Sequence, residues 1–224
     1  LVLTDAYARR SSGDVTEEVT ADVGERRGFE NDPENRLLWR GERRRATAEA
    51  LRDSMLQLSG ELAGDHRPRP IPAEIKEDYG RAPTEPRRTV LLPVYRNAIP
   101  DLLTAFDVAD PSVTVGRRNR STVPPQSLVL LNDPWVRERA AAAARRWLTE
   151  APRDAEGEVD RAALIDRMSI ACYARVASER ERQLALDFLE QADAELGNDE
   201  AARIEGLTEL VLAWWTAIDF RYLE

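Results

Sequence analysis

The sequence contains very few of the residues that build metal, haem and disulfide sites. Of its 224 residues only one is a cysteine, Cys172, and only one is a histidine, His66. A lone cysteine excludes an intrachain disulfide, and the two residues together exclude both a CxxCH haem-attachment motif and a zinc site of cysteine and histidine ligands. We therefore expect no cofactor and no metal in this chain.

Long hydrophobic runs are also missing. No apolar stretch approaches the roughly 20 residues that cross a bilayer, and the first residues do not show a signal-peptide pattern. The chain starts at Leu1, in what reads as the middle of a structural element. We therefore interpret it as a fragment of a longer protein whose targeting segment lies elsewhere, and we expect no membrane insertion by this fragment.

Positive charge is scarce and is almost entirely arginine. The formal net charge is -9, which argues against a general nucleic-acid binder, because such proteins need excess positive charge to displace counterions. Lys76 is the only lysine among 32 basic residues. This bias reflects either genome composition or the use of the cation that best tolerates burial in bidentate pairs.

Length and hydrophobic content indicate a globular chain with a real core. At 224 residues and 42% hydrophobic content, we predict a single domain over residues 1–224. Within it we distinguish an N-terminal helical part over residues 1–64, an exposed proline-rich loop over residues 65–86, and a third part over residues 87–224.

The pattern of apolar residues predicts mostly helices. An amphipathic helix is expected over residues 45–62 with Gly60 as its stop, and an extended segment over residues 89–95. Short helices are expected from Pro100 and over residues 126–131. The longer helices expected downstream are marked by an Asp133-Pro134 start, an apolar stripe over residues 164–172, a Ser178/Glu181 capping box with a stop at Gly197, and a last stripe over residues 204–218. The predicted fold is mainly α, an irregular multi-helix domain with a loop-rich, arginine-containing centre and a C-terminal helical bundle.

The most unusual stretch, residues 87–132, is the arginine-rich centre. It contains six arginines and three aspartates, a local balance of +3 in an acidic chain. Guanidinium groups and hydroxyls close together suit a carboxylate, sulfate or phosphate ligand. The candidate ligand-binding residues are Arg117, Arg118, Arg120, Tyr95, Arg96 and Gln126. The alternative is that these arginines pair internally with Glu49, Asp53, Asp107 or Asp110.

Glu49 and Asp53 are the candidate catalytic residues. Their i, i+4 spacing points both carboxylates the same way, as general acid and base work requires. Two structural interpretations compete with catalysis. In one the carboxylates form solvated ion pairs with Arg45 and Arg52, and in the other they receive arginines from the centre. Cys172 lies on an apolar stripe, which favours a buried inert thiol over a reactive one.

Three stretches closely resemble one family, the planctomycete-type domain of unknown function 1553. They are DPENRLLWRGERRRATAEALRDSMLQLSG at residues 32–60, the run from RRTVLLPVYRN to NDPWV at residues 87–136, and ARVASERERQLALDFL at residues 174–189. The resemblance spans roughly residues 7–224. It departs from the family at DHRPRP after Leu62 and near the C-terminus.

The resemblance implies a place in a larger protein. Members of this family stand at the C-terminal end of large exported proteins, and these often carry a cytochrome c-like domain near the N-terminus. It therefore implies an extracytoplasmic location in the periplasm, in the cell envelope or as a secreted protein. The preceding domains of the parent protein are then the expected partners, and any haem belongs to the parent. The family supplies no catalytic residues.

Three functions remain open from the sequence. The first is an accessory or structural domain without catalysis, in which the arginines form an internal ion-pair network. The second is a binding site for an anionic ligand such as an acidic or sulfated glycan. The third is a hydrolase using Glu49 and Asp53. The first predicts buried, paired arginines, and the second predicts unpaired guanidinium groups.

Overall fold

The computed structural model describes residues 30–41, 44–64, 85–94 and 99–223. The chain divides into two compact units, one of residues 1–46 with residues 222–224 and one of residues 47–221. Most of the loop predicted over residues 65–86 lies outside the described residues, and so do Tyr95 and Arg96. The single domain and its three parts stay a prediction.

The smaller unit contains a turn organised by Asp32. The Asp32 carboxylate accepts hydrogen bonds from the backbone N–H groups of Arg36 and Leu37, and its carbonyl accepts one from the Trp39 indole. Strand β1 (Arg44–Arg45) pairs antiparallel with β2 (Tyr222–Leu223). Arg45 therefore lies in a strand, and the prediction that the first helix begins there is wrong.

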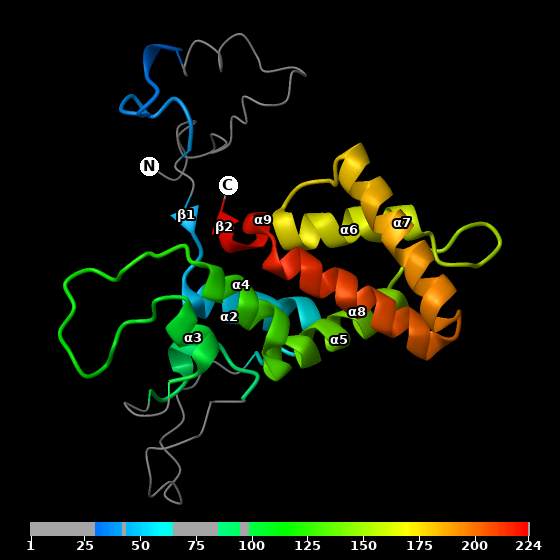
Figure 1. The fold of residues 1–224 in the computed structure, drawn as a ribbon, viewed down its shortest axis with the longest axis horizontal. Helices are drawn as coiled ribbons and strands as arrows, with labels where there is room; N and C mark the ends of the chain where they lie inside the picture. The colour runs from blue at the N-terminus through cyan, green and yellow to red at the C-terminus, as the bar shows by residue number, and fades with distance from the viewer. Residues whose placement is uncertain (1–29, 42–43, 65–84, 95–98, 224) are drawn as a thin grey trace, which may run out of the picture. The chain divides into compact units, whose positions relative to one another are not determined.

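The larger unit is built from helices, as predicted (Figure 1). In chain order its elements are α2 (Ala48–Ser59), the 3-10 helix η1 (Thr89–Leu91), α3 (Asp101–Ala105), α4 (Pro124–Asn132), α5 (Pro134–Thr149), α6 (Arg161–Tyr173), α7 (Glu179–Leu196), α8 (Glu200–Thr216) and α9 (Ile218–Arg221). Among the described residues, no helix is both long enough and apolar enough to span a membrane.

Helix ends follow the sequence signals closely. Helix α2 begins after Thr47, whose side chain accepts a hydrogen bond from Ala50 N, and ends at Gly60, where φ is 77°. Asp133 caps α5 through Trp135 N. The predicted capping box of Ser178 and Glu181 opens α7. The predicted stop at Gly60, the start at Asp133 and the capping box are confirmed, and each of these signals depends only on neighbouring residues.

The core of the larger unit lies between α5 and α8. These two helices pack along each other, α2 lies against α5, and α7 lies against α8 (Figure 1). Small side chains on α5 let the large side chains of α8 approach closely. The buried residues of this interface include Ala140, Ala143 and Ala144 on α5, and Leu207, Val211 and Trp215 on α8.

Candidate anion-binding site in the arginine-rich centre

Arg52 ties the start of the centre to α2. Its side chain is only 3% exposed, and its Nη1 and Nη2 atoms donate to the carbonyls of Arg87 and Glu85 at 2.8 and 2.7 Å. Its guanidinium carbon also lies 5.1 Å from the centre of the Trp135 ring, within the range of a cation–π contact. Burial lowers the pKa of Arg52, although the nearby Asp53 carboxylate opposes this shift. The predicted solvated ion pairing of Arg52 is therefore wrong, because this arginine serves as an internal clamp.

Asp53 organises the backbone at the same place. Its Oδ1 accepts hydrogen bonds from the backbone N and the Oγ1 of Thr89, at 2.8 and 2.7 Å. The carboxylate thereby fixes the first residue of η1. The extended segment predicted over residues 89–95 is accordingly wrong at its start, because residues 89–91 form a 3-10 turn.

Glu49 receives an arginine from the centre, as one interpretation predicted. Arg118 Nη1 donates to Glu49 Oε1 at 2.7 Å. Partial burial acts to raise the pKa of Glu49, but the hydrogen bonds and the charge of Arg118 outweigh it and leave that pKa below its ordinary value. Glu49 is thus an ionised partner of Arg118, which is the opposite of a carboxylic acid held protonated for catalysis.

The loop over residues 112–123, which we call the arginine loop, connects α3 to α4 (Figure 1). It is held at its C-terminal end by Asp107, whose carboxylate accepts hydrogen bonds from Ser121 N at 2.8 Å and from Ser121 Oγ at 3.0 Å. Gln126 is fully buried, and its Nε2 donates to the carbonyls of Ala105 and Ser121. Gln126 therefore supports the loop from within the fold.

Both aspartates of the FDVADP segment, Asp107 and Asp110, accept hydrogen bonds at the ends of the arginine loop. Asp110 Oδ1 accepts a hydrogen bond from Ser112 N at 2.8 Å, which is the pattern of an Asx turn at the start of the arginine loop. Asp107 adopts a positive φ of 59°, a conformation that Asp tolerates better than most residues. The loop is therefore anchored at both ends by a carboxylate.

Arg117 and Arg120 differ from Arg118. Both side chains are exposed, and among the described residues neither makes a hydrogen bond or an ion pair. Arg118 is itself 47% exposed, so its pair with Glu49 lies at the surface. The arginine loop thus presents two guanidinium groups whose donors are available, beside a third that is held in place. This arrangement can bind a carboxylate, sulfate or phosphate group.

Sequence reasoning missed the partners that anchor the centre. The periodicity of apolar residues does not single out Thr89, and a backbone carbonyl such as that of Glu85 cannot be recognised in a sequence as a hydrogen-bond partner. Arg87, which is buried and lies 3.3 Å from the Glu85 carboxylate, was not singled out either.

The described part of the chain offers little for a metal. Across it, no three His, Cys, Asp or Glu side chains gather in a way that could hold a metal ion. The carboxylates of Asp53, Glu49 and Asp107 instead accept hydrogen bonds, from Thr89, Arg118 and Ser121 respectively. What the geometry defines is a helical domain with an anchored, surface-exposed arginine loop.

Comparison with known families names that domain. A family model described as PSD1, a protein of unknown function (DUF1553), matches residues 1–189. The chain belongs to this family, as its resemblance predicted. The matched stretch ends within α7, whereas α8, whose side chains complete the core against α5, lies beyond it. Comparison with curated proteins and with solved structures gave no match.

Proposed function

We propose that this chain is a non-catalytic accessory domain of an exported multidomain protein, and that its arginine loop binds an anionic ligand such as an acidic or sulfated glycan. The observation that carries the proposal is the contrast within one loop. Arg118 is paired with Glu49, while Arg117 and Arg120 are exposed and have no ion partner among the described residues.

The accessory role is supported by the use of the carboxylates. Asp53 Oδ1 is occupied by two hydrogen bonds from Thr89, and Glu49 Oε1 is occupied by Arg118. A general base needs a carboxylate within reach of a substrate proton, and these atoms are already engaged. The hydrolase using Glu49 and Asp53 is therefore the less favoured function. The family resemblance is the basis for proposing that the parent protein is exported to the cell envelope and that its preceding domains are the partners of this chain.

The choice of a polyanionic glycan follows from the shape of the loop. Its two available guanidinium groups are three residues apart, so a ligand with repeated charges can engage both. Val113 and Val115 are exposed on the same loop and can contact the apolar faces of sugar rings. Gly116 has open space where a side chain would stand, which lets a ligand approach the backbone.

The test is direct binding of a labelled heparin-derived hexasaccharide, followed by fluorescence anisotropy at low salt. The protein should bind it, and the variant Arg117→Ala with Arg120→Ala should bind at least about tenfold more weakly, because each charge-assisted contact contributes on the order of 1 kcal/mol or more. A polygalacturonate oligosaccharide, which carries carboxylates in place of sulfates, distinguishes the two anion chemistries.

A charge-matched control separates specific contacts from net charge. The variant Arg137→Ala with Arg180→Ala removes the same number of exposed arginines from α5 and α7. It should bind the hexasaccharide like the unmodified protein. Equal losses in both double variants would reduce the interaction to general electrostatics and would contradict a site in the arginine loop.

A further inference from the structure

A second feature lies away from the arginine loop, around Arg203 on α8. Two cavities adjoin this side chain, a smaller one of about 150 Å³ and a more open one of about 560 Å³. Leu148, Val159 and Arg203 line both, so the two spaces meet at these residues. The site is built from α5, α6, α7, α8 and the segment over residues 150–160.

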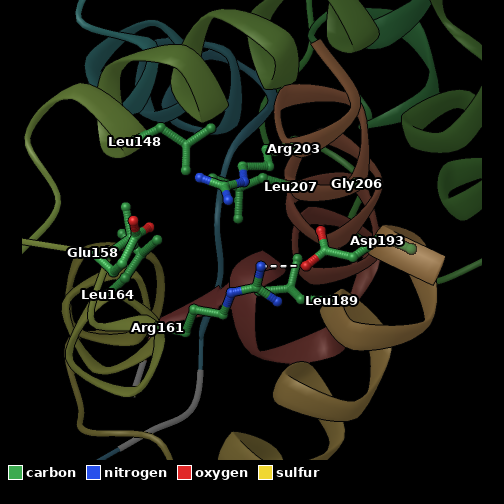
Figure 2. Close-up of a pocket in the computed structure, with 11 residues that line it drawn as sticks. Leu148, Glu158, Arg161, Leu164, Leu189, Asp193, Arg203, Gly206 and Leu207 are labelled. Carbon is green, nitrogen blue, oxygen red and sulfur yellow. Dashed lines mark hydrogen bonds and ion pairs between the residues drawn. The ribbon is translucent and has the colours of Figure 1, made fainter. Parts of the chain in front are cut away.

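Arg203 is an arginine without a counter-ion. Its Nε atom is buried from solvent and, within the part of the chain that the structure describes, has no hydrogen-bond partner. No carboxylate there forms an ion pair with it either. Figure 2 shows its side chain reaching into the space lined by Leu148 and Leu207. A buried donor of a charged group with no acceptor is unfavourable, and a bound anion would satisfy it.

The other charged groups of the site are mostly neutralised. Arg161, at the start of α6, forms an ion pair with Asp193 of α7, across the cavity from Arg203 (Figure 2). Arg153 donates to the carbonyl of Gly157 at 2.9 Å. The exposed groups at the mouth are of both signs, namely Arg145, Glu158 and Glu200. Of the two arginines that line the smaller cavity, Arg203 is therefore the one without an ion pair among the described residues.

The uncharged part of the wall of the smaller cavity is apolar. Leucines from four helices face it, namely Leu148, Leu164, Leu189 and Leu207. At its back α7 and α8 approach so closely that a Cβ added to Gly206 would lie 3.0 Å from the Cβ of Ala192. A space of about 150 Å³ beside these leucines accommodates a body the size of a benzene ring.

We propose that the Arg203 cavity binds a small monocarboxylate whose apolar body is about the size of a benzene ring. The carboxylate accepts hydrogen bonds from the Arg203 guanidinium, and the apolar body lies against the four leucines. The open cavity beside Arg145 and Arg153 gives access from solvent. This site is separate from the arginine loop, and it stands whether or not that loop binds a glycan.

The experiment uses benzoate as the probe and the Nε–Hε signal of Arg203 as the readout. Because this group is buried, its proton should exchange slowly enough to be seen by 1H–15N NMR at pH 7. Benzoate should shift the Arg203 signal and the amide signals of Leu148 and Gly206, with a dissociation constant of about 1 mM. Benzamide, which has the same shape and no charge, should bind at least about tenfold more weakly.

Three variants complete the test. Arg203→Gln should weaken benzoate binding about tenfold or more, with a melting temperature within about 3 °C of the original, since Arg203 has no described partner to lose. Val159→Trp, which fills the shared wall while keeping every charge, should also abolish binding. Arg180→Gln, which removes an exposed arginine from α7, should bind benzoate normally.

Several results would overturn the proposal. They are an unchanged Arg203 signal at saturating benzoate, equal binding of benzamide, and full binding by Val159→Trp. If Arg203→Gln fails to fold, the Arg203 side chain is needed for folding and that variant cannot test binding. The Val159→Trp variant is then the test, and benzoate binding by it would show that the cavity is not the binding site.

Discussion

Arg118 donates a 2.7 Å hydrogen bond to Glu49, a residue 69 positions earlier in the chain. This contact joins the arginine loop to α2, and it divides the three arginines of the loop into one that is held and two that are available. Both partners are accessible to solvent, with side chains 47% and 23% exposed. The contact positions the loop, and because it is exposed we expect it to contribute little to folding.

A double-mutant cycle on this pair should give a small coupling. We expect Arg118→Ala and Glu49→Gln each to fold, and their coupling free energy to be about 0.2–1 kcal/mol, because exposed ion pairs are screened by water. Urea unfolding of the two single variants and the double variant measures it. Loss of folding in Arg118→Ala would show that the loop belongs to the core.

Replacing Arg52 should be far more damaging. In Arg52→Met the carbonyls of Glu85 and Arg87 lose their donors and Trp135 keeps only the cation contact with Arg139, so we expect the free energy of unfolding to fall by about 2–4 kcal/mol. Chemical denaturation measures the loss. Arg88→Met, at an exposed neighbouring arginine, should stay within about 0.5 kcal/mol of the original. Similar effects of both variants would contradict the clamp.

Arg52 and Arg118 show which parts of the structure could be predicted from the sequence and which could not. Helix α2, its stop at Gly60 and the capping box of Ser178 and Glu181 were predictable, because each depends on residues one or two turns apart. The clamp of Arg52 on Glu85 O was not, since a backbone carbonyl 33 residues away leaves no mark on the sequence. The sequence offered several carboxylates as possible partners of Arg118. Which of them it pairs with depends on the folded structure, which brings Glu49 within reach.

Glu181 should make the free energy of unfolding depend on pH in the acidic range. The hydrogen bond from Arg175 is the main cause that lowers the pKa of Glu181 to about 2, from an ordinary value of 4.5. A lowered folded-state pKa means that the stabilisation is present above about pH 4.5 and is lost as the pH falls towards 2. Its size is reduced by solvent, because the side chain is more than one third exposed.

The variant Glu181→Gln isolates this charge, since glutamine also completes a capping box. Thermal unfolding between about pH 6 and about pH 2.5 should show a smaller drop in melting temperature for the variant than for the original protein. Glu179→Gln, at an exposed neighbour on the same helix, should leave the drop nearly unchanged. Identical pH profiles for Glu181→Gln and the original protein would contradict the assignment.

Cys172 should be unreactive while the protein is folded. Cys172 is half-buried, and loss of hydration raises the pKa of its thiol to about 12, so almost no thiolate exists at pH 8. Iodoacetamide followed by mass spectrometry should show slow alkylation in buffer and rapid alkylation in urea. Rapid modification of the folded chain would mean that the stripe on α6 opens or that the thiol is accessible.

The most direct test of the account is the salt dependence of hexasaccharide binding by the arginine loop. Each arginine that neutralises a ligand charge releases counterions, so the slope of log Kd against log salt reports how many take part. We expect Arg117→Ala with Arg120→Ala to reduce this slope by roughly 1–2, and Arg137→Ala with Arg180→Ala to leave it unchanged. An unchanged slope in the loop variant would contradict the central claim that Arg117 and Arg120 hold an anionic ligand.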